Sequence, residues 1–404
     1  MTHPARIAAA IELLTAILAV PARPADSVAR DYFRSRRFIG SGDRRAVSML
    51  VWRVLRSYRR LHWWLDDQAA PRLLIAASLL LDGGSLDAIA AAFSGARFAA
   101  APLIPSEQTA LCRLEGCTLD HPCMPQAVRL EVPDWLLPSI DAADLRALLA
   151  PATLDLRVNL LKTTRQQART ALAAEGVETI LTHHSPWGLR IEGRRQVTTG
   201  PTFRAGLVEI QDEGSQLVAA LVGAQPGFRV LDLCAGAGGK TLALAMTMQN
   251  RGQLVACDVS STRLKRAAGR LRRAGVHNAE LHFLTPGDTW LQQSAGTFDR
   301  VLVDAPCTGT GTWRRTPDAR LRLTEARLAE LLPVQAAIVD QAASLVRPGG
   351  LLVYATCSLL REENEDQVAG FLARRSDFAQ RESLTWTPAR HGTDGFFATV
   401  LARR

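Results

Sequence analysis

The feature that most constrains the fold is a series of short apolar segments, separated by helical stretches, that begins near residue 206. The strand candidates are Arg229–Leu233, Leu254–Val259, Glu280–Leu284, Arg300–Asp304 and Leu351–Thr356. Continuous apolar strands joined by helical crossovers are typical of a parallel sheet with helices on both faces. The sequence therefore predicts a Rossmann-like α/β domain over residues 206–404.

Two further regions precede this domain. Residues 1–130 are rich in Ala, Leu and Arg with helical periodicity, which predicts an all-α domain. Residues 131–205 alternate strand and helix signals: "LDLRVNLL" favours a strand, and "TRQQARTALAAEG" favours a helix that ends at Gly176. This alternation predicts a small α+β module between the two larger domains.

The charge of the chain points to a polyanionic partner. The 404 residues carry a formal net charge of +9, and residues 1–65 hold 12 arginines against 4 acids, a net of +8. A local basic excess favours nucleic acid. Arg53, Arg56 and Arg60 recur at helical spacing, either as an RNA-facing stripe or as an ordinary solvated face, and the sequence leaves both interpretations open.

The hydropathy pattern and the cysteines indicate whether the chain crosses a membrane and whether its thiols are reduced. No run of 18 apolar residues is present, so we expect no membrane span. Seven cysteines without a dense framework indicate reduced thiols and a cytoplasmic setting. The group Cys112, Cys117, His121 and Cys123 has a spacing that matches no standard zinc pattern, so we expect no metal site there.

A glycine loop, "VLDLCAGAGGKT", follows the first strand and opens a helix. A phosphate-binding loop would need glycine at Cys234, and a dinucleotide fingerprint would need it at Thr241, so both motifs fail by one position. Asp258 ends the next strand, where a carboxylate can accept hydrogen bonds from both ribose hydroxyls of an adenosine, although it could also simply cap a helix. These features predict a nucleoside cofactor without phosphates, S-adenosylmethionine, and Asp288 is a candidate partner for the adenine amino group.

Two later strands each end in a thiol, in "VLVDAPCTGTGTWRR" and "LLVYATCSLL". Because the carboxyl ends of parallel strands share one edge, we expect Cys307 and Cys357 to face one crevice. Thiolate addition to carbon 6 of a pyrimidine would activate carbon 5 for methylation, with Asp304 at ring nitrogen 3 and a base to remove the carbon 5 proton. The alternative is that the thiols are small buried hydrophobes, as we expect for Cys234, beside the cofactor loop, and Cys257, inside a strand. The residues alone do not select which thiol attacks.

These motifs resemble the RNA 5-methylcytosine methyltransferases of the RsmB/NOP/Sun family. The matching segments are "VEIQDEGSQL", "LDLCAGAGGKT", "ACDVSSTRL", "FDRVLVDAPCTGTGTWRRTPD", "LVRPGGLLVYATCSLLREENEDQV" and "DGFF". "LRVNLLKT" is similar to the RRM-like module of the family, and residues 1–130 are similar to its NusB-like RNA-binding domain. One departure is Gly236-Ala237, where the family commonly has Ala-Pro.

The resemblance implies a role for each site residue. Cys357 would be the nucleophile, Cys307 would assist release, and Asp304 would contact the target base. Lys240 would neutralise charge beside Asp304 or the cofactor. The residues that would hold S-adenosylmethionine are Cys234, Ala235, Gly236, Ala237, Gly238, Gly239, Lys240, Asp258, Asp288 and Asp304.

We therefore predict a monomeric RNA cytosine-5 methyltransferase acting on 16S ribosomal RNA. The alternatives are a transfer RNA enzyme of the same family and a catalytically idle RNA-binding assembly factor. Among the flanking charged residues, Arg314 and Arg315 are expected to bind phosphates or to form loop ion pairs. Glu362, Glu363 and Glu365 are expected to stabilise a helix N-terminus. A solvated face is expected for Arg263, Arg266, Arg270 and Arg273.

Overall fold

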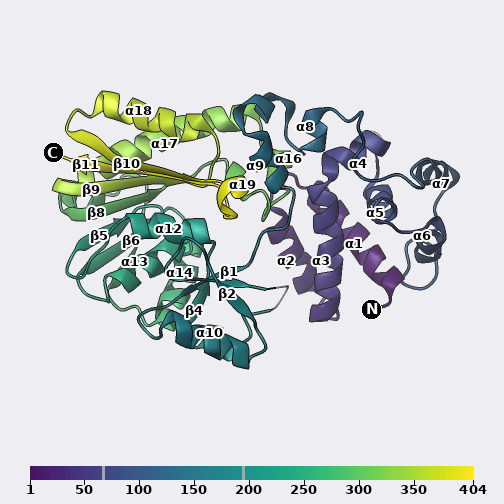
Figure 1. Cartoon of the computed structure of the whole chain (residues 1–404), viewed down its shortest axis with the longest axis horizontal. Helices are drawn as coiled ribbons and strands as arrows, with labels where there is room; N and C mark the ends of the chain where they lie inside the picture. The colour runs from purple at the N-terminus through teal and green to yellow at the C-terminus, as the bar shows by residue number, and fades with distance from the viewer. Residues whose placement is uncertain (66–68, 193–195) are drawn as a thin grey trace. The chain divides into compact units, whose positions relative to one another are not determined.

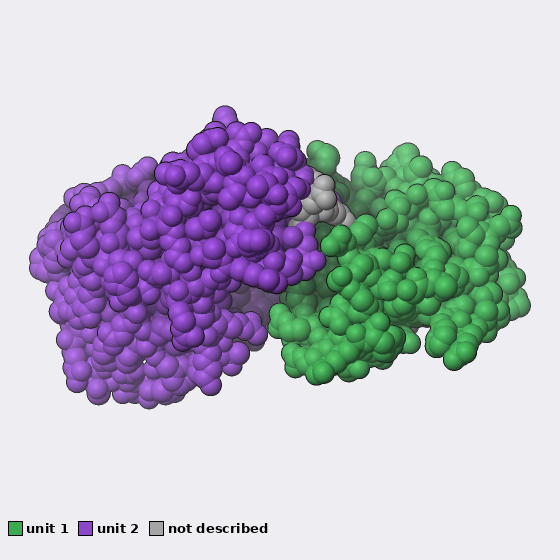
Figure 2. Space-filling model, turned by 90° about the horizontal axis from the view of Figure 1, so that it is seen from below, with its two compact units in different colours: residues 1–150, 313–323 green, residues 151–312, 324–404 purple. Residues whose placement is uncertain are grey.

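The computed structural model describes residues 1–65, 69–192 and 196–404, which form two compact units (Figure 2). Unit 1 comprises residues 1–150 and 313–323, and unit 2 comprises residues 151–312 and 324–404. No helix within the described ranges is long and apolar enough to cross a membrane. The boundaries that we placed at 130 and 205 remain predictions, because the units group residues by packing and not by domain family.

Unit 1 is helical (Figure 1). Its apolar core includes Ile7, Leu13, Val51 and Leu74, all essentially inaccessible to solvent. The helices are α1 (His3–Leu18), α2 (Ala25–Ser35), α3 (Ser41–Arg56), α4 (Tyr58–Leu65), α5 (Pro71–Leu80), α6 (Leu86–Ala92), α7 (Pro105–Cys112), α8 (Gln126–Arg129), η1 (Asp134–Ser139), α9 (Ala142–Ala147) and α16 (Ala319–Arg322).

The segment Trp313–Leu323 reaches unit 1 from far along the chain, and it contains α16. Its Asp318 accepts a hydrogen bond from the backbone N–H of Ala25 at 2.9 Å and so caps the first turn of α2. Arg320 donates to the carbonyl of Leu148 at 2.6 Å. The segment is therefore an integral part of the helical unit.

A small antiparallel sheet in unit 2 has the order β2-β3-β1-β4. Its elements are β1 (Asp155–Val158), α10 (Arg165–Ala174), β2 (Thr179–Leu181), β3 (Gly188–Ile191), α11 (Pro201–Arg204) and β4 (Val208–Ile210). Leu156, Leu172 and Leu189 form its core. The strand and the helix expected at the start of this module are confirmed as β1 and α10, and α10 begins with Thr164 and Gln167 in a capping box.

The larger sheet of unit 2 has seven strands in the order β10-β11-β9-β8-β5-β6-β7. Its strands are β5 (Arg229–Asp232), β6 (Gln253–Asp258), β7 (Ala279–Phe283), β8 (Phe298–Asp304), β9 (Val346–Thr356), β10 (Phe378–Trp386) and β11 (Phe396–Arg403). The first five pair in parallel and correspond to the five predicted strands, so the Rossmann-like fold is confirmed. The antiparallel pair β10 and β11 extends the sheet beyond the strands we predicted.

Helices cover both faces of this sheet (Figure 1). Successive strand residues point to opposite faces: Val230 packs in the cluster with Leu244, and Leu231 packs in the cluster with Val339. The helices with buried residues in these layers are α12 (Glu213–Leu221), α13 (Gly239–Thr247) and α14 (Ser261–Ala274) on the first face and α17 (Glu325–Leu345) and α18 (Glu365–Arg374) on the second. Short elements connect them, namely α15 (Trp290–Gln293), η2 (Thr310–Thr312), η3 (Arg361–Glu363) and α19 (Pro388–His391).

The strand order reverses at β5, which pairs with β6 on one side and with β8 on the other. The carboxyl ends of these parallel strands therefore meet at one edge, which is where ligands bind in open α/β sheets. Asp232, Asp258, Asp304 and Cys357 stand at or just beyond the ends of β5, β6, β8 and β9. This edge contains the candidate site.

Candidate active site

The glycine loop turns sharply between β5 and α13. Gly236 and Gly238 have φ angles of +57° and +79°, in the left-handed region that favours glycine. A Cβ atom on Gly236 would meet nothing within 4 Å, so open space lies beside this residue. The loop thus presents bare backbone at the carboxyl end of the central strand.

Asp258 connects this loop to the start of α14 through its two carboxylate oxygens. Its Oδ2 accepts from the backbone N–H of Gly236 at 2.8 Å, and its Oδ1 accepts from the N–H of Ser260 at 2.7 Å. The next residue, Val259, is 75% exposed, so its apolar side chain is accessible to a ligand at this edge. A carboxylate, bare backbone and an exposed apolar side chain together suit the ribose and adenine of a nucleoside, so these residues fit the expected cofactor.

Asp288 is already engaged within the protein. Its carboxylate lies 2.7 Å from Nε2 of His282 and accepts from the backbone N–H of Trp290 at 2.9 Å. The Trp290 N–H and then His282 hold the pKa of Asp288 below its usual range. The predicted contact of Asp288 with adenine stays a prediction.

Two arginines brace the glycine loop from neighbouring elements. Arg270 of α14 donates to the carbonyl of Ala237 at 2.7 Å and pairs with Glu209 at 3.4 Å. Arg157 of β1 donates to the carbonyl of Gly239 at 2.8 Å, so the small sheet contacts the start of α13. The expectation of a wholly solvated arginine face on α14 is therefore wrong at Arg270, and at Arg273, which also pairs with Glu209.

The two candidate cysteines meet as expected from the strand ends. The Sγ atoms of Cys307 and Cys357 lie 3.4 Å apart, within hydrogen-bond distance for sulfur. The Cys357 sulfur and then burial raise the pKa of Cys307 well above its usual range. Either sulfur could donate the hydrogen bond that joins the two thiols. Burial is the largest cause that raises the pKa values of Cys234 and Cys257.

Lys240 and Asp304 form an ion pair beside the thiols. Nζ of Lys240 lies 2.6 Å from Oδ2 of Asp304 and 5.5 Å from the ring centre of Phe396. Burial alone would lower the pKa of Lys240, but the Asp304 carboxylate more than offsets this and raises it. Lys240 is only 8% exposed, so it is a fixed ammonium group, while Asp304 keeps part of its carboxylate accessible.

Glu363 connects the loops that follow the two cysteines. It is fully buried; its Oε1 accepts from the N–H of Thr308 at 2.8 Å and from Nε2 of Gln335 at 2.8 Å, and its Oε2 accepts from the Thr308 hydroxyl. The expectation that Glu363 serves a helix N-terminus is wrong, because its side chain turns inward to the loop after Cys307. Sequence reasoning missed this contact because the partner is 55 residues away.

Asp232 is a second buried acid that the sequence reading overlooked. Burial raises its pKa to about 7, and the Thr241 hydroxyl donates to its Oδ2 at 2.7 Å. Its other oxygen has no hydrogen-bond partner among the described residues. Its position at the end of the central strand was the signal available in the sequence.

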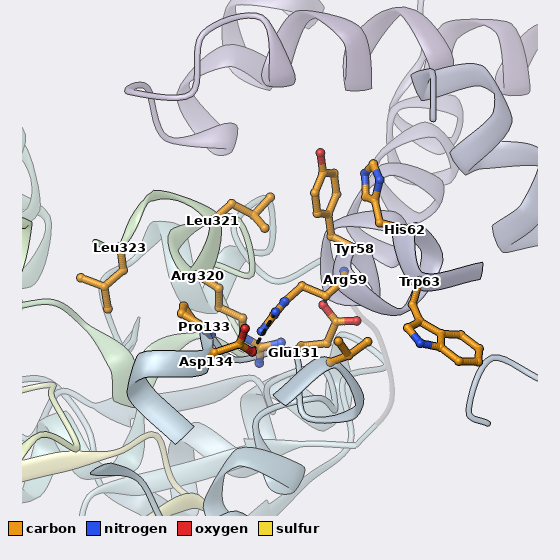
Figure 3. A pocket seen from close by; sticks show the side chains of 11 residues that line it. Tyr58, Arg59, His62, Trp63, Glu131, Pro133, Asp134, Arg320, Leu321 and Leu323 are labelled. Atoms are coloured by element: carbon orange, nitrogen blue, oxygen red, sulfur yellow. Dashed lines mark hydrogen bonds and ion pairs between the residues drawn. The ribbon is translucent and has the colours of Figure 1, made fainter. Parts of the chain in front are cut away.

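The arginine stripe of the N-terminal helices is largely neutralised within unit 1. Arg53 pairs with Asp82, and Arg60 is buried against Glu131 at 3.0 Å. Figure 3 shows the neighbouring pair of Arg59 and Asp134 in a cavity of about 610 Å³. Arg60 therefore fits neither an RNA-facing stripe nor a solvated face. Arg314 is also buried, so it is not a free loop arginine.

The cysteine-rich loop of unit 1 forms no metal cluster. Cys112 and Cys123 are exposed, and Cys117 is half-buried. Across the part of the chain that the structure describes, no group of three or more His, Cys, Asp or Glu side chains could hold a metal ion.

Comparison with known proteins identifies the family. Residues 219–402 match the model of the 16S rRNA methyltransferase RsmB/F, and residues 138–198 match the ferredoxin-like domain of RsmF/B-like methyltransferases. A ribosomal RNA small subunit methyltransferase B from Xylella fastidiosa is 38% identical over 289 residues, which is 67% of this chain and 68% of the relative. A probable enzyme of the same name from Synechocystis is 35% identical, covering 67% of this chain but just under two thirds (66%) of that relative.

Solved structures share the fold. A methyltransferase homolog protein from Pyrococcus horikoshii has a TM-score of 0.62 at 26% identity, covering 69% of this chain and 98% of that chain. A protein called PH0851 has a TM-score of 0.81 at 24% identity, covering 99% of both chains. From the two family models, the sequence relatives and the arrangement of strands and motifs, this chain belongs to the RsmB/F family of 16S rRNA methyltransferases.

Proposed function

We propose that this protein is an S-adenosylmethionine-dependent RNA cytosine-5 methyltransferase that uses Cys357 as its nucleophile. The observation that carries the proposal is the pair of sulfur atoms 3.4 Å apart where β8 and β9 end. A hydrogen bond from one thiol stabilises its neighbour as the thiolate, and either sulfur could be the donor here. Two thiols within reach of each other fit a division between attack and release, and the resemblance to the RsmB/NOP/Sun family supports Cys357 as the attacking group.

The cofactor would lie against the glycine loop, with Asp258 at the ribose and Val259 beside the adenine. When bound there, S-adenosylmethionine supplies an electrophilic methyl group. No guanidinium or ammonium group of the loop is left over for a pyrophosphate, because Lys240 is paired with Asp304. This charge arrangement supports a phosphate-free nucleoside.

Addition begins when the Cys357 thiolate forms a bond to carbon 6 of the cytosine. The electron pair of the carbon 5–carbon 6 double bond moves into the ring, and a proton reaches nitrogen 3 from the Lys240–Asp304 pair. Carbon 5 then carries the electron density that accepts the methyl group. Asp304 is suited to contact the base because it is partly exposed while held by the buried ammonium of Lys240.

Release requires removal of the carbon 5 proton. Once Cys357 has bonded to carbon 6, its sulfur no longer acts on the Cys307 thiol through a hydrogen bond or a charge, which are two of the causes that raise the pKa of Cys307. Cys307 can then lose its proton to solvent and take up the carbon 5 proton. The carbon 5–carbon 6 double bond re-forms, Cys357 leaves as a thiolate, and nitrogen 3 returns its proton. One proton is released for each methyl group transferred.

The substrate we propose is 16S ribosomal RNA. The support is the family, whose model carries that substrate in its description, and the two relatives that are small subunit enzymes. A transfer RNA substrate is the second candidate. We further propose a cytoplasmic monomer, in keeping with the free cysteines throughout the described chain.

Trapping of a covalent RNA adduct tests the assignment of the thiols. Cys357→Ala is expected to lose methyl transfer and to form no adduct, because carbon 6 has no nucleophile. Cys307→Ala is expected to form the adduct but not to release it, so RNA-linked protein should accumulate on denaturing gels. Cys112→Ala, at an exposed thiol in unit 1, is the matched control and should behave as wild type.

The outcomes are distinguishable. Adduct formation by Cys357→Ala and not by Cys307→Ala would reverse the roles. Methyl label in a base other than cytosine, mapped by bisulfite sequencing of the modified RNA, would refute cytosine specificity. Label in transfer RNA but not in small-subunit ribosomal RNA would favour the second substrate, and its absence from all cellular RNA would favour the idle assembly factor.

A further inference from the structure

A second group of arginines in unit 1 surrounds a hollow of about 470 Å³. Arg30 and Arg34 lie one turn apart on α2, and Arg44 lies on α3. Arg37 follows α2, and Phe33 is the one uncharged residue of the lining. Four guanidinium groups therefore face one hollow whose described lining contains no carboxylate.

These arginines have fewer carboxylate partners than Arg53 and Arg60 have. Arg34 lies 3.5 Å from Asp31, which forms its shorter bond, 2.7 Å, with Arg23. Arg44 donates through Nε to the carbonyl of Ile39 at 2.7 Å, and this bond does not use its two terminal nitrogens. Asp26, the other acid of α2, lies close enough to Arg30 for that charge to act on its pKa, but it forms no ion pair with Arg30 in the described structure.

The hollow lined by Arg30, Arg34, Arg37 and Arg44 differs in net charge from the larger cavity of about 610 Å³ in the same unit. That cavity places Arg59 and Arg320 beside Glu131 and Asp134, so its lining is close to neutral and would not attract an anion. The 470 Å³ hollow carries four positive charges against one shared carboxylate at its edge. A polyanion is the ligand that this field favours.

We propose that Arg30, Arg34, Arg37 and Arg44 bind backbone phosphates of the substrate RNA. Guanidinium groups match phosphate oxygens through paired hydrogen bonds, and positively charged grooves bind the backbone of single-stranded RNA. The Phe33 ring packs against the helical core with the Arg44 guanidinium 5.9 Å from its centre, so it helps to position that arginine. This inference rests on the proposed RNA substrate and adds the surface that holds it.

The salt dependence of RNA binding tests the proposal. A labelled single-stranded RNA of about 20 nucleotides is titrated with the full-length protein at several salt concentrations. The double variant Arg34→Gln/Arg37→Gln changes two exposed side chains, so folding should be preserved, and a thermal melt verifies it. Two lost phosphate contacts should reduce the slope of log K against log salt by about 1.4. KM for RNA should rise while kcat at saturating RNA is unchanged.

Two further variants make the result specific. Arg113→Gln/Arg146→Gln removes the same charge from two exposed arginines of unit 1 that do not line the hollow, and its slope should equal that of wild type. Arg34→Lys/Arg37→Lys keeps the charge and should restore most of the slope. An equal loss of slope in the Arg113/Arg146 control would overturn the site, because the effect would then be one of net charge.

The failure of this inference differs from the failure of the proposed function. If wild-type protein methylates and binds RNA but Arg34→Gln/Arg37→Gln has the wild-type slope and KM, the hollow is not the RNA site and the enzyme assignment stands. If wild-type protein shows no salt-dependent RNA binding, the RNA substrate itself is refuted. Equal binding of poly-L-glutamate of matched length, lost in the same variant, would replace RNA by an acidic polypeptide.

Discussion

At the scale of single residues, the carboxyl groups of Asp232, Asp258 and Asp304 lie near one another at the carboxyl edge of the large sheet. They would repel one another if all three were charged. The pKa of Asp232 rises to about 7 because the carboxyl group is buried, and the nearby charges of Asp304 and Asp258 add to this effect. Lys240 is the cation among them and is paired with Asp304. The folded protein therefore favours a protonated Asp232 at a pH where the unfolded chain has released that proton.

This difference predicts a pH dependence of stability. The contribution of protonated Asp232 to the free energy of unfolding is fully present below about pH 4, which is the pKa of an unfolded aspartate. This contribution is lost as pH rises through about 7. The free energy of unfolding should fall over this interval by up to about 4 kcal/mol. Asp232→Asn should flatten the decline, as measured by urea unfolding at several pH values. An unchanged slope in the variant would show that other groups set it.

The sequence predicted some of these residues and not others, for a physical reason. Cys307, Cys357, Asp304 and Asp258 were predictable because strand ends of a parallel sheet share an edge, so position along the chain implies position in space. Glu363 and Arg270 act through side-chain contacts with loops far along the chain, at Thr308 and Ala237. Such contacts leave no periodicity to detect.

At the scale of elements, the glycine loop depends on two glycines for different reasons. Gly238 sits at the start of α13 with φ +79°, and a Cβ there would come within 3.0 Å of the Cβ of Ala267 on α14. Gly236 shares the left-handed conformation but has open space around it. Gly238 thus sets both the turn and the close approach of two helices.

Substituting each glycine by alanine should separate the two effects. Gly236→Ala should cost about 1 kcal/mol of stability, from backbone conformation alone. Gly238→Ala should cost roughly 1–3 kcal/mol more, because the buried Ala267 must also move. Urea unfolding of the two variants measures the difference, and equal losses would contradict the steric part.

At the same scale, β10 and β11 were not predicted from the sequence, for two different physical reasons. The segment "FAQRESLTW" has few apolar residues, and most of β10 is exposed at the sheet edge, so it lacks the apolar run that marked the parallel strands. β11 is apolar and almost wholly buried. It does not follow a helical crossover, however, which is the feature that marks the parallel strands.

At the scale of the whole molecule, the helical unit is completed by residues 313–323, which follow the loop after Cys307 in sequence. No pattern in the sequence predicted this, because the segment looks like an ordinary loop of the methyltransferase domain. Trp313 is fully buried, and Asp318 caps a helix 293 residues earlier in the chain.

Hydrogen exchange of the full-length protein can test this long-range cap. Asp318→Ala removes the acceptor for the Ala25 N–H, and losing such a cap costs about 1 kcal/mol. The amides at the start of α2 should exchange several times faster, while those of the seven-stranded sheet should not change. Asp366→Ala, at an exposed acid beginning α18, is the matched control. Faster exchange in the sheet but not in α2 would contradict the assignment of Asp318 to the helical unit.

The placement of this segment also sets an order of events during synthesis. The helices of residues 1–150 leave the ribosome long before residue 323 does, and until then α2 lacks its cap and the core lacks Trp313. Domains generally fold from the N-terminus as they emerge, but this one stays incomplete until more than three quarters of the 404 residues have been made. A nascent chain that stalls before residue 313 would therefore carry an unfinished first domain.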